Sequence, residues 1–548
     1  MVETQNSNNR QVRHFRQIFL WPLQLMPIRE GAQIQNHWEL LQKGGPDNPW
    51  HELQDEFTGD PGEFKLRHYN EFVSFLPYVQ RFIYGESRAA TPGSDPRASS
   101  MRVFRRDDIG SVRVTASPGD APLLLSVAHV DLYFFYDVDV VLLNMEVFAD
   151  ELPLRQVQEL LYRFGRTYPA NWTDAGDGEH CMHRVEWLAA DGSMLAVSDY
   201  EKRDKYLSFV CRHRAACIAS HWAFLMRPLV LDHFEEKGLI RYRQLEYYRM
   251  PLMAYLAVDN PRALPRADLI RLALATGSGD TLPFADQHLA DFDSRFCYDR
   301  YWCDSPDIPS TRFMSCGHTL VVVGDAQSKF FTGREAGVLA QFRHQYFLVF
   351  MIAHLQKAAL LMFSDRLVEA LNSLDIQNTD TVRRFKRAIR QTFEIFLRFT
   401  HRYWFHELSD QAQTKALFKL TSEHLGTDAL FAEVKQEIHD MSQYLDSDSL
   451  RRQANTAIRL VVVTTFGLIG TVVTGFLGMN LISYAEAPLI NRALFFFVVA
   501  VPTIWLTFYT IYKSKRLSDF LEALSDENLP AGRKFSALLD VWRRHQSD

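Results

Sequence analysis

The chain has 548 residues, which is too long for one ordinary domain and predicts two to four. Hydrophobic residues make up 47% of it and charged residues 23%, so most of the chain can bury a core. The formal net charge of −6 is small for this length and argues against a nucleic-acid binder, because such proteins carry a basic surplus.

The first 332 residues divide into two predicted parts. Residues 1–102 are expected to be an N-terminal extension, irregular over 1–35 and carrying a flexible Gly-, Pro- and Ser-rich loop at 85–100. Residues 103–332 are expected to form an α/β domain. Its strands are predicted from β-branched and aromatic runs at 112–116, 129–148, 194–200 and 318–324, and a helix is predicted from apolar spacing at 152–166.

Residues 333–459 are predicted to be helical, because helical periodicity continues through them with few breakers. The helical segments are expected at 333–378, 380–407, 409–425 and 427–459. The first contains the apolar run HQYFLVFMIAHLQKAALLMF, which Gln345, His354 and Gln356 interrupt. A membrane span needs roughly 20 mostly apolar residues, so we expect this helix to be buried in protein instead.

Residues 460–512 are predicted to contain two transmembrane helices. Residues 460–477 form an 18-residue run without a charge, and residues 493–512 form another of 20. Basic residues flank the outer ends of both runs, and the connecting loop carries only Arg492, balanced by Glu486. The flanking residues are Arg451, Arg452, Arg459, Lys513, Lys515 and Arg516. By the positive-inside rule, both termini are expected in the cytoplasm of a multi-pass inner (plasma) membrane protein.

Small and hydroxyl residues recur along the first run, at Gly467, Thr471 and Gly475 and beside them at Gly470, Thr474 and Gly478. This pattern has two interpretations. Small residues let helices pack closely in a membrane. Threonine hydroxyls and glycine carbonyls can also line a pore and hold the water around an ion. A single helix cannot enclose a channel, so the second interpretation requires several copies around an axis.

The triplet Gly478-Met479-Asn480 closes the first of these two C-terminal runs, after a long helical region. In this the chain resembles the CorA family of divalent-cation (Mg²⁺) channels and transporters. The resemblance implies an α+β cytoplasmic domain, long helices, a two-transmembrane-helix C-terminal hairpin and a homopentamer in the lipid bilayer. It further implies one stalk helix over about 428–479, with a pore lined by Leu460, Thr464, Leu468, Thr471, Gly475, Gly478 and Met479, and Asn480 at the outer mouth.

The implied chemistry is passive transport of Mg²⁺ and needs no cofactor. Mg²⁺ gives up water reluctantly, and a ring of Asn480 amide oxygens can hydrogen-bond the hydrated ion. Glu486 would attract cations to the mouth, unless it is an ordinary solvated charge. The sequence has no GxxxxGK[ST] loop, no GxSxG elbow and no HExxH, so we expect no enzyme. The tail, 513–548, is expected in the cytoplasm, with an amphipathic helix at 516–527.

Two alternative functions stay open. The same scaffold could transport Zn²⁺, Co²⁺ or Ni²⁺, although residues 460–492 offer oxygen ligands and no Cys or His, which favours a hard ion. The chain could also be a non-conducting membrane-tethered scaffold whose enlarged N-terminal region binds a partner.

Other clusters upstream are candidate metal sites. Zinc takes four nitrogen or sulfur ligands, and such ligands occur in His180-Cys181-Met182-His183, in Cys217 with His221, and in Cys316 with His318. We expect mostly core cysteines and surface histidines. An acidic stretch could sense Mg²⁺, but its alternation predicts a strand with one solvated face. It comprises Asp131, Asp137, Asp139, Asp150 and Glu151.

Overall fold

The computed structural model describes residues 10–27, 36–45, 48–53, 66–85, 100–235, 238, 240–246, 249–303, 305, 308–375, 378–478 and 488–525. The chain divides into two compact units, Met1–Met441 and Ser442–Asp548. The first unit is a mixed α+β sheet domain followed by long helices, and two long apolar helices lie near the C-terminus. This order of domain and helices was expected from the sequence.

One sheet of 14 strands organises the first unit, and its main path runs β12-β13-β14-β11-β1-β6-β5-β4-β7-β8. β2, β3, β9 and β10 pair outside this path. The strands are β1 (Gln11–Leu25), β2 (Trp50–Glu52), β3 (Met101–Arg106), β4 (Ser111–Thr115), β5 (Leu123–Phe135), β6 (Val138–Pro153), β7 (Arg184–Leu188), β8 (Met194–Val197), β9 (Val230–Leu231), β10 (Arg241–Gln244), β11 (Leu252–Val258), β12 (Cys297–Tyr298), β13 (Thr311–Ser315) and β14 (Thr319–Asp325).

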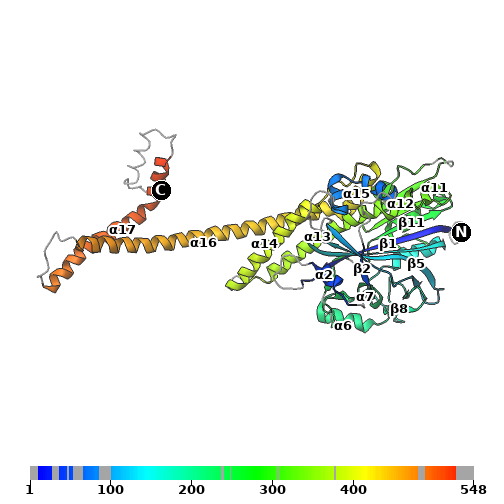
Figure 1. The fold of residues 1–548 in the computed structure, drawn as a ribbon, viewed down its shortest axis with the longest axis horizontal. Coiled ribbons are helices and arrows are strands. Elements are labelled where there is room, and N and C mark those ends of the chain that lie inside the picture. Colours follow the sequence, from blue (N-terminus) through cyan, green and yellow to red (C-terminus); the bar gives the residue numbers. More distant parts are fainter. Residues whose placement is uncertain are drawn as a thin grey trace. The chain divides into compact units, whose positions relative to one another are not determined.

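β1 lies inside the sheet, antiparallel to both β6 and β11 (Figure 1). The expectation that residues 1–35 are irregular is therefore wrong for this strand, and the sheet takes strands from both sides of residue 102. The basic residues hid the strand, because Arg13 and Arg16 find acidic partners within the sheet domain. The other predicted strands are confirmed, except that 129–148 is a hairpin of β5 and β6 with its turn at Asp137.

The helices of the sheet domain lie on both faces of the sheet (Figure 1). They are α2 (His37–Gln42), α3 (Leu66–Val73), α4 (Pro77–Tyr84), α5 (Leu154–Arg163), α6 (Arg203–His213), α7 (Ser220–Met226), η3 (Pro261–Ala263), α8 (Arg266–Leu274), α9 (Asp286–Leu289), α10 (Phe292–Phe296) and α11 (Lys329–Thr332). Those that follow are α12 (Val338–Arg343), α13 (Gln345–Asn372), α14 (Thr379–Arg402), α15 (Ala412–Leu425), α16 (Thr427–Gly478) and α17 (Leu489–Ser525).

The main hydrophobic core lies between one face of the sheet and helices α5, α7 and α8. Alternate side chains of β1 enter it, as the period of two in a strand requires. Phe19 illustrates the packing, because its ring meets Phe164 at 5.0 Å and Trp222 at 6.1 Å between centroids, both edge-on. Each such buried side chain stabilises the fold by about 1.5–3 kcal/mol.

The other face of the sheet is covered by α13, which contacts β1 and β6. The apolar segment Val338–Asn372 is 83% buried, so the prediction that this helix is enclosed by protein is confirmed. Two of its buried polar side chains form hydrogen bonds within the protein. Gln356 donates from Nε2 to the carbonyl oxygens of Tyr403 and Phe405, and His354 Nε2 lies 3.2 Å from the carbonyl oxygen of Gly317.

α14 packs on α13 and its C-terminal end meets the beginning of α16. Trp404, just after α14, stacks on Phe431 with ring centroids 4.1 Å apart. α16 then continues as one helix of 52 residues, which confirms the helix expected over about 428–479. α17 continues without a break from Leu489 to Ser525 and so includes the described part of the helix expected at 516–527.

A buried network of charges joins the sheet to α12. Glu146 is 1% exposed and receives hydrogen bonds from Arg16 at 2.6 Å and Arg343 at 2.9 Å. His129 Nε2 lies 3.0 Å from Glu146, and its Nδ1 lies 3.1 Å from a carboxylate oxygen of Asp131. Arg105 binds that Asp131 with two hydrogen bonds of 2.7 and 2.8 Å. The alternating signs compensate one another inside the protein.

The two carboxylates hold the His129 imidazole in its charged form. Burial lowers the pKa of His129, but hydrogen bonds and charge attraction from Asp131 and Glu146 outweigh burial and raise it to about 9. Burial would raise the pKa of Glu146, but His129, Arg343 and Arg16 outweigh it and lower that pKa to about 2. His129 therefore contributes its full stabilisation below its unfolded pKa near 6.5, and loses it as the pH rises through 9.

Replacing His129 by Gln should lower the free energy of unfolding by about 3 kcal/mol at pH 6, because two buried carboxylates lose a shared cation. The difference from the wild type should shrink as the pH rises from about 6.5 to 9. Thermal unfolding of the full chain in detergent across this range measures it.

His14→Gln is the matched control. His14 lies 2.8 Å from Asp150, but both side chains are at least half exposed, so this pair contributes at most about 1 kcal/mol. Equal losses from the two substitutions, or a loss for His129→Gln that stays the same between pH 6.5 and 9, would contradict this account of the buried network.

Candidate functional site

Two apolar segments near the C-terminus are exposed in the single chain. Leu489–Tyr509 spans 21 residues with a mean hydropathy of 1.9 and is 6% buried. Gly467–Phe476 is a shorter apolar stretch in the described part of α16. The burial of these segments is opposite to that of Val338–Asn372, which the sheet domain encloses. Long apolar helices with exposed surfaces could be membrane spans.

The residues predicted to line a pore share one exposed face of α16. Thr464, Leu468, Thr471, Gly475 and Gly478 follow one another at intervals of three or four, and all are exposed. Leu468 is 59% exposed, whereas Val473, on the opposite side of the helix, is 5% exposed. We call Thr464, Leu468, Thr471, Gly475 and Gly478 the glycine–threonine face.

No neighbour in the described part of the chain packs closely against the glycines of this helix. A Cβ atom added at Gly467, Gly470, Gly475 or Gly478 would meet no atom of the described chain within 4 Å. Glycines that allow two helices to approach within one chain would show such a contact. If these residues serve close packing, the partner is not among the described residues of the same chain.

The threonine hydroxyls on and beside this face donate to the helix backbone. Thr471 Oγ1 donates to the carbonyl oxygen of Gly467 at 2.8 Å, and Thr474 Oγ1 to that of Gly470 at 2.7 Å. Each hydroxyl has one proton, so these oxygens present only acceptor lone pairs to the surroundings. Such acceptors suit the water hydrogens of a hydrated cation and satisfy the hydroxyls without any other partner.

The remaining predicted pore residues have no described side-chain environment. Leu460 belongs to α16, but its side chain falls outside the description. Met479, Asn480 and Glu486 lie outside the described residues. Gly478 is the last residue of α16, so the helix ends within the predicted triplet.

The acidic stretch proposed as a Mg²⁺ sensor is occupied by basic side chains. Asp137 pairs with Arg402 at 2.7 Å and Arg398 at 3.2 Å, and Asp139 pairs with Arg366. The expectation of solvated carboxylates is wrong for Asp131, which is 1% exposed. The other contacts are Asp131 with Arg105, Asp150 with His14 and Glu151 with Arg13. These partners lie far away in the sequence, so the strand pattern gave no sign of them.

The His180–His183 segment splits between core and surface. Cys181 and Met182 are buried, whereas His180 and His183 are exposed, as expected. Burial raises the pKa of the Cys181 thiol to about 12, which disfavours the thiolate that a metal needs. The chain thus uses the middle of this segment for packing.

Neither of the other two cysteine–histidine pairs belongs to a group of three ligand-bearing side chains among the described residues. His221 is fully buried, not at the surface as expected, and burial lowers its pKa to about 3. Cys316 Sγ does approach His318, at 3.6 Å from Nδ1. However, His318 also contacts the Arg249 guanidinium, and burial together with that charge lowers its pKa to about 3. A cation already stands beside this pair.

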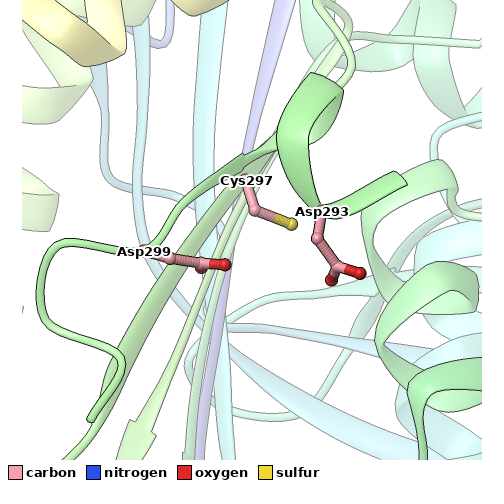
Figure 2. Close-up of side chains that lie close together, drawn as sticks. All are labelled: Asp293, Cys297 and Asp299. Carbon is pink, nitrogen blue, oxygen red and sulfur yellow. The ribbon is translucent and has the colours of Figure 1, made fainter. Parts of the chain in front are cut away.

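The described residues hold one group of three side chains with metal-ligand atoms close together, Asp293, Cys297 and Asp299, whose ligand atoms lie within 4.8 Å of one another. Asp293 comes from α10 and Cys297 from β12. Figure 2 shows the Cys297 thiol between the two carboxylates. The run DFDSRFCYD carries all three, so its spacing was visible in the sequence, but the sequence analysis did not select it.

Arg312 on β13 fills the role that a metal would have in this group. Its guanidinium is 6% exposed and donates to Asp293 at 2.5 Å and to Asp299 at 2.7 Å. Burial raises the pKa of Cys297 to about 12, so the thiol stays protonated. The buried guanidinium thus has two carboxylate partners, Asp293 and Asp299, which are 45% and 35% exposed. The group is therefore structural, and it fixes the β12–β13 edge of the sheet.

No protein-family model matches this chain, and no curated protein matches it either. Inferences about function therefore come from the residues themselves.

Substituting Arg312 by Gln should lower the free energy of unfolding by about 1.5–3 kcal/mol, because a buried guanidinium would lose its hydrogen bonds to two partly exposed carboxylates. Thermal and urea unfolding of the full chain in detergent measure this. Arg13→Gln is the control, since Arg13 and its partners Asp259 and Glu151 are all well exposed and its loss should cost much less. If Zn²⁺ stabilised the wild type and Cys297→Ser abolished that effect, the structural interpretation would be wrong.

Proposed function

We propose that this protein forms a homo-oligomeric membrane pore, lined by α16, that conducts a divalent metal cation passively, with Mg²⁺ as the preferred ion. The observation that carries the proposal is the glycine–threonine face. It is exposed along the apolar part of α16, opposite the buried Val473, and no described atom of the chain lies within 4 Å of a Cβ added at Gly475 or Gly478. Copies arranged around an axis would bring these faces together.

The chemistry of this face suits an ion that keeps its water. Thr471 on this face and Thr474 beside it donate their hydroxyl protons to backbone carbonyl oxygens, so these hydroxyls can only accept further hydrogen bonds. Mg²⁺ dehydrates reluctantly, and its bound waters are strong donors. Acceptor oxygens without a formal charge can hold such an ion weakly enough to release it. Leu468 adds an apolar ring that can close the pore by dewetting.

The resemblance to the CorA family, which also implied the pore-lining role of this face, supports the same proposal. It rests on Gly478-Met479-Asn480 at the end of the first apolar run, followed by a short loop and a second apolar helix. On this basis Asn480 binds the hydrated ion at the outer mouth, Glu486 attracts cations to it, and the copies number five. The basic flanks place the sheet domain, both termini and the 513–548 tail in the cytoplasm.

The driving force in this proposal is the ion gradient with the membrane potential. The potential contributes about 2.3 kcal/mol per elementary charge at 100 mV, and hence about twice that for a divalent cation. Inward movement of cations therefore needs no chemical step at the protein.

Two other functions remain as competing proposals. A Zn²⁺, Co²⁺ or Ni²⁺ transporter would use the same scaffold, but the glycine–threonine face offers oxygen rather than nitrogen or sulfur ligands. A non-conducting scaffold would use the large sheet domain to bind a partner. The glycine–threonine face favours conduction, since a simple anchor has no need for acceptor oxygens along one side.

Purified protein in liposomes should carry Mg²⁺ down its gradient, and it should carry Mg²⁺ in preference to Zn²⁺, Co²⁺ and Ni²⁺. An ion-sensitive dye inside the liposomes measures the flux. Faster flux of Zn²⁺ than of Mg²⁺ would favour the transition-metal function. If oligomeric protein carries none of these ions, the channel function is rejected and the non-conducting scaffold becomes the favoured proposal.

Cysteine substitution tests the glycine–threonine face directly. A cationic thiosulfonate reagent should abolish most of the flux through Thr471→Cys, because the attached charge would stand in the pore. The same reagent should leave Val473→Cys conducting, since Val473 lies on the opposite side of α16. Wild type treated in parallel controls for the exposed native Cys211. Equal block of both variants, or block of Val473→Cys alone, would show that another face lines the pathway.

Asn480→Ala should reduce Mg²⁺ flux about tenfold, which corresponds to about 1.4 kcal/mol of lost ion binding, without changing the unfolding temperature. Asn491→Ala, near the start of α17, is the control for an amide removed outside the triplet. Unchanged flux and selectivity would remove Asn480 from the ion path.

A further inference from the structure

α14 is strongly basic in a chain that is acidic overall. It carries seven Lys and Arg residues and only two acidic residues. Arg383, Arg387 and Arg390 lie at positions i, i+4 and i+7, so they share one face of the helix, and all three are exposed. We call these three residues the basic seam.

The basic seam faces away from the subunit that carries it. The opposite side of α14 holds Phe385, Ile389 and Phe396, which are at most 5% exposed. Phe396 also stacks near Phe431 of α16, with ring centroids 5.7 Å apart. The apolar side of α14 is thus already used for packing within the chain.

α16 carries a matching acidic row near its start. Glu433, Glu437 and Asp440 occupy positions i, i+4 and i+7 of that helix. Glu433 and Asp440 are exposed and Glu437 is half-buried, while Val434 and Ile438, on another side of the helix, are at most 2% exposed. We call Glu433, Glu437 and Asp440 the acidic seam.

Neither seam is neutralised by the described part of its own chain. Among the described side chains, the basic seam has one ionic contact, Arg383 with Asp380 at 3.8 Å, and both of these side chains are about three-quarters exposed. In the acidic seam, Asp440 accepts a hydrogen bond from the uncharged Gln436. Partial burial, together with the nearby Glu433, raises the pKa of Glu437, as expected for a carboxylate without a cationic partner.

We propose that the basic seam of one copy docks on the acidic seam of a second copy of this chain, forming the repeated contact of a ring. Both seams have three charges with the same spacing, over about 10.5 Å of helix. Opposite charges in matched positions give register and orientation to an interface. The proposal rests on the oligomer of the proposed function and names the surface that builds it.

A two-fold dimer and a ring would use the two seams differently. In a two-fold dimer the basic seam meets the acidic seam twice within one interface, and assembly stops at two copies. A head-to-tail interface joins two different patches, and closed repetition of it gives a ring around an axis. A chain with two separate complementary patches has what a ring needs.

The acidic seam also argues for a protein partner over a lipid surface. An anionic membrane would attract Arg383, Arg387 and Arg390, but it would leave the acidic seam without a role and repel it. Exposed apolar side chains continue along α14 beyond the arginines, with Phe393 37% and Leu397 43% exposed. A second helix with its own side chains can cover both the charged and the apolar parts.

Charge reversal with rescue tests the interface in the full chain in detergent. Arg387→Glu with Arg390→Glu, or Glu433→Lys with Glu437→Lys, should each raise the apparent dissociation constant of the oligomer at least about tenfold. Combining all four changes should restore the wild-type constant. Mass measurement over a concentration series gives each value. Arg203→Glu with Arg212→Glu, on the exposed side of α6, is the control for a change of charge elsewhere and should have no effect.

Several results would overturn the proposal. It is wrong if neither reversal changes the constant, or if the fourfold variant, with an unchanged unfolding temperature, fails to recover. It is also wrong if the arginine reversal leaves the dissociation constant unchanged and abolishes binding of the protein to phosphatidylserine vesicles. That result would identify a lipid partner for the basic seam. If a variant does not fold, the salt dependence of the wild-type oligomer provides the test. Raising NaCl from about 0.05 M to about 1 M should raise its apparent dissociation constant. An unchanged constant would contradict the pairing of the two seams.

The test separates this inference from the proposed function. An oligomer that responds to both reversals but moves no ion in liposomes would keep the interface and reject the channel. Ion flux from an oligomer whose dissociation constant is unchanged by both reversals would support the channel and reject the interface.

Discussion

Glu146 is the point on which the arrangement of the sheet domain depends. Its carboxylate is buried, and it binds Arg16 from β1, His129 from β5 and Arg343 from α12. A buried carboxylate is costly unless cations compensate it, so these elements must meet at one place. β1 is thereby fixed to α12, the helix that precedes α13. The sheet and the helices fold as one body because this charge cannot be left alone.

The same rule governs the other acidic groups of the sheet domain and limits what they can do. Asp137 already has two arginines, and Asp293 and Asp299 share Arg312. A regulatory cation at these places would have to displace a guanidinium and leave it buried or poorly solvated. Regulation by a metal, if the protein has it, must therefore use carboxylates without such partners. Glu433 and Glu437 of the acidic seam are of that kind, but matched arginines of a second copy offer them a better partner than a hydrated ion.

The sequence predicted those features that depend on local pattern. Local periodicity predicted a helix at 427–459 and an apolar span at 460–477, and α16 covers both over Thr427–Gly478, as the family resemblance implied for about 428–479. The burial of α13 followed from polar residues such as Gln356, which an exposed membrane helix would not carry. β1 was missed because Arg13 and Arg16 look like a solvated start until their distant partners are known. Arg312 could not be paired with Asp293 for the same reason, since no periodicity connects a helix end with a later strand.

The glycine–threonine face sets a final constraint on the proposed membrane part. In hydrocarbon, backbone and hydroxyl groups must find partners within protein or water. Thr471 and Thr474 satisfy their protons internally, but their remaining lone pairs and the glycine surfaces still face outward. Leucine would suit lipid better at the glycine and threonine positions of this face. The face is consistent either with close contact to other copies or with water between the copies. The proposed ring would provide both, because copies would touch at the sides of the face and water would fill the centre.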